Sequence, residues 1–332
     1  MKRPIHRRWW FILLEVLLAL SLCLAAVLST TTVLQKNLIR LICAGNAGIE
    51  PPDYDAVLSR IVTLEQDLSY ESDFPMGTLD LYAAASDSPQ PLIVYAHGGY
   101  YVGDDKEDFT YYCQTLASYG YVVANLNYQL APEGQYPTQI LQVNEAVSFL
   151  ADHAAEYGID ISRVFIGGDS AGAHLASQMG LYYTSDSFRA ATGGTAALAP
   201  SQLRGVILLC GYYDTETVRE THFPMIADSI WMLTGEKRYE GTEVSARMNT
   251  VSRIASSYPP AFIACGNTDP FLPQAQELIA ALEQSGVPLA TYLPGSDEEP
   301  LWHEYQRNLA SQAGEETMSL LLQFLQEQSA AN

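Results

Sequence analysis

The chain has 332 residues, of which 48% are hydrophobic and 17% are charged, and its formal net charge at pH 7 is -21. This hydrophobic content excludes a disordered chain and allows a large buried core. The negative charge excludes nucleic acid as a partner, because binding to phosphates requires a basic surface.

The first predicted element is an apolar segment near the N-terminus, Trp9 to Leu28, which only Glu15 and Ser21 interrupt. A helix needs about 20 residues to cross a bilayer, and this segment has that length. More basic residues precede the segment than follow it, so residues 1–35 are predicted to be a cytoplasmic tail and a transmembrane signal anchor, with the catalytic domain outside. A signal peptide that is cleaved, which would leave a secreted protein, is the alternative.

Residues 36–59 show no strong periodicity and contain two adjacent prolines, so they are predicted to be a linker. Residues 60–332 are predicted to form one large domain. Within it, residues 212–258 are long for a connection and rich in aromatic and apolar side chains. This stretch predicts a small helical cap over a substrate pocket.

Strand and helix patterns alternate through this domain. Residues 78–82 alternate apolar and polar side chains like a half-buried edge strand. Continuous apolar runs predict strands that are covered on both faces, at 92–96, 121–126, 164–166, 205–209 and 261–264, with one more strand at 288–293. Helical patterns lie between them, at 108–118, 138–156, 171–183, 273–286 and 314–328. The alternation predicts an α/β fold whose mostly parallel central sheet carries helices on both faces.

A G-x-S-x-G motif, Gly168-Asp169-Ser170-Ala171-Gly172, lies between a predicted strand and a predicted helix. In this setting a sharp turn exposes the serine hydroxyl. Gly168 and Gly172 lack the side chains that would collide with neighbouring backbone, and Asp169 supports the turn. The N-terminus of the helix directs N–H groups toward the same point. We therefore predict that Ser170 is a nucleophile.

A second loop, His97-Gly98-Gly99-Tyr100, directly follows the predicted strand 92–96. Adjacent glycines let the backbone approach a substrate closely. Backbone N–H groups stabilise the negative charge that develops on a carbonyl oxygen during acyl transfer. We predict an oxyanion hole formed by the N–H groups of Gly99, Tyr100 and Ala171, with His97 and Gly98 as supporting residues.

Asp269 and His303 complete a predicted catalytic triad. Asp269 follows the predicted strand 261–264, at a carboxyl end where the active sites of such sheets lie. His303 follows the last predicted strand, which produces the chain order Ser, Asp, His. In this arrangement His303 is the general base and Asp269 orients it. Asp214, at the end of the preceding strand, is the alternative acid.

The five cysteines include no C-x-x-C pair and no cluster with histidine. Neither a metal site nor a disulfide framework is therefore predicted, and no cofactor is expected.

The motifs H-G-G-x, G-D-S-A-G and G-x-x-D-P, followed by a late histidine, resemble those of the hormone-sensitive-lipase-like carboxylesterases. The resemblance covers residues 60–330. It implies the α/β-hydrolase fold and hydrolysis of carboxylic esters, of small or medium acyl chains, without a cofactor. Tyr100 departs from the family pattern, and an H-G-G-Y loop is also similar to that of kynurenine formamidases, which cleave an amide.

Other functions remain open at this stage. The small-molecule substrate is expected to be an ester or an amide. If an alcohol instead of water accepted the acyl group in the second step, the protein would be an acyltransferase. Some proteins of this fold are non-catalytic adhesion or ligand-binding modules. The oligomeric state does not follow from the sequence.

Overall fold

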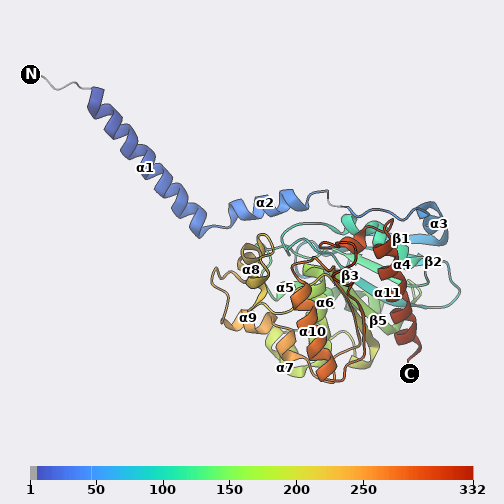
Figure 1. Ribbon diagram of the computed structural model, residues 1–332. Helices are drawn as coiled ribbons and strands as arrows, with labels where there is room; N and C mark the ends of the chain where they lie inside the picture. The colour runs from blue at the N-terminus through green and yellow to red at the C-terminus, as the bar shows by residue number, and fades with distance from the viewer. Residues whose placement is uncertain (1–5, 46, 332) are drawn as a thin grey trace, which may run out of the picture.

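The described residues, 6–45 and 47–331 of this computed structural model, fold around an eight-stranded sheet (Figure 1). The order across the sheet is β1-β2-β4-β3-β5-β6-β7-β8. Strand β2 is antiparallel to both of its neighbours, and the strands from β4 to β8 are parallel. The strands are β1 (Ile61–Ser69), β2 (Thr78–Ala84), β3 (Gln90–Ala96), β4 (Val122–Leu126), β5 (Ile159–Asp169), β6 (Leu203–Leu209), β7 (Ala261–Ala264) and β8 (Leu289–Tyr292).

Helices cover both faces of this sheet. Because side chains alternate along a strand, neighbouring residues supply opposite layers of the core. Phe165 packs with residues of α4 (Thr110–Ala117) and α11 (Gln312–Ala330). Ile166 packs on the other side, with residues of α5 (Thr138–Asp152), α6 (Ala171–Thr184) and α10 (Leu272–Gln284). The predicted α/β architecture is confirmed, and α7 (Asp186–Thr192) adds a short helix after α6.

The predicted edge strand at 78–82 is an interior strand. β2 lies between β1 and β4, and its central residues are buried. The actual edge strand, β1, was not predicted. Its side chains are exposed or half-buried, and its pairing with β2 contains two irregularities, so it lacks the regular alternation that marks a strand.

The segment predicted to be a linker contains two helices, α2 (Val33–Cys43) and α3 (Tyr54–Arg60). α2 packs against the body through Ile39 and Cys43, which are buried, and Arg40 Nε donates to Val102 O at 2.9 Å. The apolar side chains of α2 follow a helical period, which the linker prediction overlooked.

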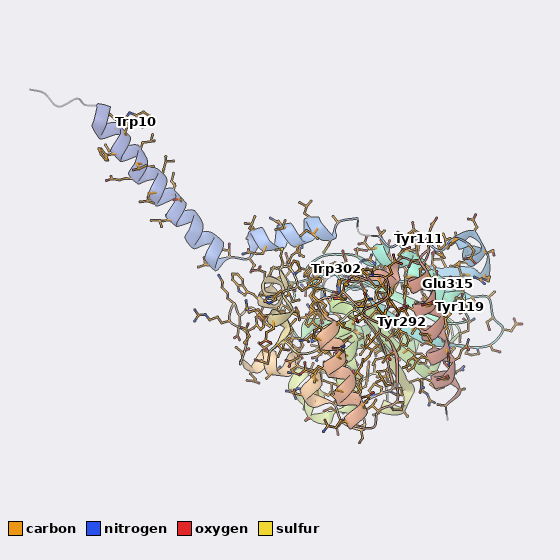
Figure 2. All side chains as sticks on the ribbon, in the orientation of Figure 1. Trp10, Tyr111, Tyr119, Tyr292, Trp302 and Glu315 are labelled. Atoms are coloured by element: carbon orange, nitrogen blue, oxygen red, sulfur yellow. The ribbon has the colours of Figure 1, made fainter. Side chains whose placement is uncertain are left out.

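The N-terminal helix α1 (His6–Thr30) extends away from the body (Figures 1 and 2). Its described apolar side chains are exposed, Trp10 at 71%. No helix in the described part of the chain combines the length and the apolarity needed to cross a membrane. The side chains of residues 24–28, which belong to the predicted span, lie outside the described ones.

Short helices occupy the stretch predicted to be a cap. They are η3 (Val218–Thr221), α8 (Ile226–Thr234), α9 (Glu243–Met248) and η4 (Val251–Arg253). α8 contacts the loop after β3, because Ser229 Oγ donates to Tyr100 O at 2.6 Å. The cap stretch is thus connected to the end of the sheet where the predicted active site lies.

A buried ion pair joins the edge of the sheet to the loop after β3. Lys106 Nζ lies 2.8 Å from Asp80 Oδ1, and both side chains are almost fully buried. Lys106 Nζ also lies 2.9 Å from Oδ1 of Asp67, whose side chain is 76% exposed. We expect Asp80→Ala to lower the free energy of unfolding by about 3–5 kcal/mol. The substitution leaves the buried ammonium group of Lys106 paired only with the exposed carboxylate of Asp67.

Urea denaturation measures this loss. Asp67→Ala is the matched control, with an expected loss of under about 1 kcal/mol, because exposed pairs contribute little. Equal losses in the two variants would show that burial of the Asp80 carboxylate is not what matters.

Candidate active site

Ser170 lies at a tight turn between β5 and α6. Its φ of 51° and ψ of -114° lie outside the regions that L-residues favour. Ser170 N–H donates to Leu209 O at 2.8 Å, which ties the turn to the end of β6. A Cβ added at Gly168 would lie 2.3 Å from Ala96 O, and one at Gly172 would lie 2.0 Å from the same atom. The motif therefore needs both glycines, because the end of β3 packs directly on the turn.

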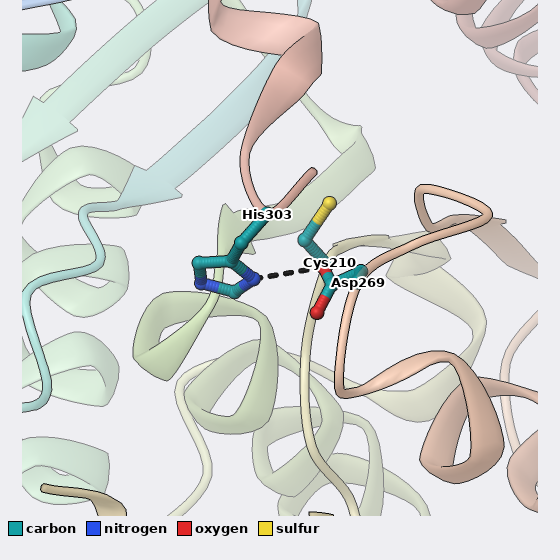
Figure 3. Close-up of side chains that lie close together, drawn as sticks. All are labelled: Cys210, Asp269 and His303. Carbon is teal, nitrogen blue, oxygen red and sulfur yellow. Dashed lines mark hydrogen bonds and ion pairs between the residues drawn. The ribbon is translucent and has the colours of Figure 1, made fainter. Parts of the chain in front are cut away.

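His303 connects the predicted nucleophile to the predicted acid. His303 Nε2 lies 2.9 Å from Ser170 Oγ. On the other side of the ring, His303 Nδ1 lies 2.8 Å from Asp269 Oδ2, the contact drawn as a dashed line in Figure 3. The other carboxylate oxygen of Asp269 accepts a hydrogen bond from Phe271 N–H at 2.8 Å. The structure thus brings together the three residues that the sequence assigned to a triad.

Asp214, the alternative acid, has other partners. Its Oδ1 accepts hydrogen bonds from Asn249 Nδ2 at 2.6 Å and from Glu216 N–H at 2.8 Å. These contacts hold the loop after β6. Asp269, not Asp214, is the carboxylate that hydrogen bonds to His303.

The surroundings of His303 act on its pKa in opposite directions. Burial lowers the pKa, but the hydrogen bond and charge of Asp269, together with the charge of Glu304, outweigh burial, so the pKa of His303 is raised above its ordinary value. Phe223 and Phe271 lie against the ring, with centroids at 4.6 and 5.2 Å. With these rings against it, the His303 side chain is only 9% exposed.

The loop after β3 presents backbone N–H groups toward the same region. Gly99 and Tyr100 both have positive φ, of 84° and 63°. A Cβ at Gly99 would lie 2.4 Å from Gly103 O, so this position admits only glycine. Within the described residues, no protein acceptor takes a hydrogen bond from the N–H groups of Gly99, Tyr100 or Ala171. These are the groups predicted to form an oxyanion hole.

His97 supports this loop from inside the protein. It is fully buried and stacks on Tyr128 with centroids 4.5 Å apart, and Tyr128 Oη donates to His97 O at 2.7 Å. Burial lowers the pKa of His97 to about 4, so its ring is neutral. Its contacts are those of a residue that holds the loop.

Cys210 lies beside Asp269 and His303, and their potential ligand atoms lie within 4.8 Å of one another (Figure 3). Both ring nitrogens of His303 have hydrogen-bond partners. Cys210 Sγ–H donates to Gln306 Oε1 at 3.2 Å, and burial raises the pKa of this thiol. The three groups therefore do not form a metal site, since a metal needs a thiolate and a free imidazole nitrogen.

Sequence reasoning missed Glu304 and Arg307, which lie beside the triad. Glu304 follows His303 and its carboxylate is 2.9 Å from Arg307 Nη1. Nothing in the local sequence distinguishes them from surface residues. Only the fold places them against Asp169.

Residues 79–282 match the model of the family described as BD-FAE. The chain belongs to the BD-FAE family. Among its relatives, the esterase LipQ of Mycobacterium tuberculosis is 25% identical over 67% of this chain and 54% of its own length. Kynurenine formamidase of Danio rerio is 28% identical over 65% of this chain and 69% of its own length. The matched segments span about half the length of most of these curated relatives.

Solved structures also resemble this chain. Esterase B of Lactobacillus rhamnosis superposes with a TM-score of 0.72 at 25% identity, over 83% of this chain and 90% of its own. The predicted resemblance to hormone-sensitive-lipase-like carboxylesterases and the α/β-hydrolase fold are confirmed.

Proposed function

We propose that the protein is a serine hydrolase that cleaves carboxylic esters of small or medium acyl chains. The observation that carries this proposal is the continuous hydrogen-bonded series from Asp269 through His303 to Ser170. The esterases among the relatives support it. No cofactor enters the reaction that we propose.

In the proposed cycle, His303 accepts the proton of Ser170 as the serine oxygen attacks the ester carbonyl. The N–H groups of Gly99, Tyr100 and Ala171 stabilise the oxyanion. The protonated His303 then donates its proton to the departing alcohol, and an acyl-enzyme remains. Water, deprotonated by His303, attacks the acyl-enzyme and releases the acid. Asp269 stabilises the imidazolium in both steps.

Hydrolysis of a p-nitrophenyl ester series, from acetate to decanoate, tests this proposal with the full chain. We expect activity on the short esters. A folded protein that hydrolyses no member of the series contradicts the assignment as a general carboxylesterase.

Aromatic side chains around His303 support the assignment to small and medium acyl chains. Phe223, from the cap stretch, stacks on Phe271 at 4.4 Å and lies 5.6 Å from the ring of Tyr100. Ser170 itself is only 7% exposed. Phe223 thus restricts the space next to the nucleophile.

We expect Phe223→Ala to raise the ratio of kcat/KM for decanoate to that for butyrate by at least about tenfold, since each added methylene contributes about 1–3 kcal/mol once it is accommodated. Phe188→Ala is the control, because Phe188 is a buried phenylalanine of α7 that contacts Arg253 and no triad residue. The control should lower stability without changing the ratio. An unchanged ratio in Phe223→Ala contradicts the proposed restriction.

Amide hydrolysis of the kynurenine-formamidase type is the second candidate. The H-G-G-Y loop and the 28% identical relative favour it. Comparing kcat/KM for N-formylkynurenine and p-nitrophenyl butyrate separates the two candidates. Added acceptor alcohols test acyl transfer in the same assay. A complete hydrogen-bonded triad argues against a non-catalytic module.

We also propose that α1 attaches the protein to a membrane, with the catalytic domain outside. The support is the run of exposed apolar side chains along the described part of α1. Flotation of the full chain with neutral phosphatidylcholine vesicles tests this. Failure to float contradicts it, and release of a shortened chain from cells favours the alternative of a cleaved signal peptide.

A further inference from the structure

Two buried carboxyl groups meet between the predicted nucleophile and the predicted base. Asp169 directly precedes Ser170, and Glu304 directly follows His303. The two carboxyl groups lie around the same point at Gly98, close enough to form a hydrogen bond if one of them carries a proton. This contact therefore joins the turn that carries the nucleophile to the loop that carries the base.

The loop of the predicted oxyanion hole lies on the same pair. A Cβ added at Gly98 would lie 2.9 Å from Asp169 Oδ2 and 3.0 Å from Glu304 Oε1. Gly98 thus has no side chain because the carboxyl groups occupy that space. Three segments of the proposed catalytic machinery converge on one hydrogen bond.

That hydrogen bond requires a proton. No N–H or O–H group of the described residues donates to Asp169 Oδ2, and Tyr95 Oη donates to Oδ1 at 3.3 Å. Two adjacent buried carboxylates cannot both be ionised at neutral pH, because burial and mutual repulsion favour one neutral acid. One of the two groups must therefore donate to the other.

The charged neighbours decide which group holds the proton. Arg307 Nη1 lies 2.9 Å from Glu304 Oε2, and His303 Nε2 lies 3.8 Å from Glu304 Oε1. Burial raises the pKa of Glu304, but His303 and Arg307 outweigh it and the net pKa is lowered. Burial, followed by the charge of Glu304, raises the pKa of Asp169 well above its ordinary value. These opposite directions favour Asp169 as the protonated acid and Glu304 as the anion.

We propose that Asp169 and Glu304 are positioning residues, whose shared proton keeps His303 aligned with Ser170 and holds the oxyanion loop against both. The proposal rests on the proposed function for the reaction that it positions. Glu304 has a φ of 58°, a left-handed conformation that a non-glycine residue adopts only when its surroundings hold it. The hydrogen bond to Asp169 and the ion pair with Arg307 stabilise this conformation of Glu304. Arg307 is itself fixed, because its Nη2 donates to Asp108 O at 3.1 Å.

The proposal predicts that activity falls at alkaline pH. Loss of the shared proton as the pH rises leaves two adjacent anions, which repel each other and displace His303. The other groups that act electrostatically on the pair, from the elements packed against it, are Asp104, His303, Arg307, Tyr95, Tyr100, Tyr112, Tyr128, Cys43 and Cys113. Burial raises the pKa of each of these tyrosines and cysteines, so they stay neutral in the same range.

Two substitutions of Asp169 separate the hydrogen bond from the titrating proton. Asp169→Ala removes both, and we expect kcat for p-nitrophenyl butyrate to fall by about 10²-fold with little change in KM, as expected of a misplaced catalytic group. Asp169→Asn restores a donor to Glu304 without a titrating proton. We expect the kcat of Asp169→Asn to be at least about tenfold higher than that of Asp169→Ala. We also expect its activity not to fall at alkaline pH, as the activity of the wild-type protein does.

Two results overturn the proposal. One is an Asp169→Asn protein, folded by circular dichroism, that is as impaired as Asp169→Ala. The other is an Asp169→Asn protein that keeps the alkaline decrease of the wild type. Either result would mean that Asp169 acts by packing alone.

Infrared difference spectroscopy gives a readout that needs no substrate. The wild-type protein should show the carbonyl band of a buried protonated carboxyl group, and this band should disappear at alkaline pH and be absent from Asp169→Asn. If the band is present but no ester is hydrolysed, the pair stands and the proposed function fails. If esters are hydrolysed and the wild type shows no such band, the pair is refuted, even where the Asp169 variants do not fold.

Discussion

Ser170→Ala is expected to lower kcat for p-nitrophenyl butyrate by about 10⁴-fold or more. The serine oxygen forms the acyl-enzyme in the proposed cycle, and without it only the oxyanion groups and substrate binding remain. The substitution removes one oxygen at a partly strained turn, so the fold should persist. Steady-state kinetics, with mass spectrometry after treatment with a reactive phosphonate, measure the effect. The wild-type protein should carry one covalent adduct on Ser170.

Ser177→Ala is the matched control for this substitution. Ser177 lies in the same helix, α6, and is buried, with its Oγ 2.8 Å from Thr250 Oγ1. It touches no triad residue, so we expect kcat to stay within a few fold of wild type. A Ser170→Ala protein that keeps wild-type activity, or a phosphonate adduct on another residue, would refute the assignment of Ser170.

Asp269→Asn is expected to lower kcat by about 10⁴-fold, the effect of the same change in a serine protease triad. The amide nitrogen of asparagine donates to His303 Nδ1, which moves the imidazole proton to Nε2. An Nε2 that carries a proton cannot accept the proton of Ser170. Kinetics across a range of pH measure this, because the acid side of the profile reports the pKa of His303.

The direction of the pH shift follows from the balance of effects on His303. Burial lowers its pKa, and Asp269 raises it to a net value above the ordinary one. Wild-type activity should therefore appear as the pH rises through this raised pKa, where His303 becomes neutral. Asp269→Asn removes the larger raising effects and leaves only that of Glu304, so the pKa of His303 should fall and the remaining activity should persist to lower pH. Asp214→Asn, which alters the alternative acid, should leave the acid side unchanged.

Much of the candidate site could be predicted because its chemistry is carried by short motifs. The turn at Ser170 needs glycine at two positions because the end of β3 packs on it, but both glycines stand within one motif of five residues, which the sequence shows directly. Gly99 adopts a positive φ in the same way. The buried strands were also predictable, since strands covered on both faces read as continuous apolar runs.

Elements at the periphery were harder to predict. β1 buries few side chains and lacks a regular alternation. α2 is amphipathic, but the linker prediction did not use that pattern. Both elements contact parts of the chain distant in sequence: β1 through its ladder with β2, and α2 through Arg40 and Cys43 against the loop at Val102 and Gly103.

The sequence by itself determined the nucleophile turn, the glycine loop and the order of strands and helices, because each depends on the sterics or periodicity of neighbouring residues. Only the tertiary structure decided which aspartate meets His303, and that the carboxyl groups of Asp169 and Glu304 lie side by side. Strand order brings these groups together from distant parts of the chain, and burial makes their charges interdependent. Electrostatic effects of this kind arise from distances in space, which a local pattern does not encode.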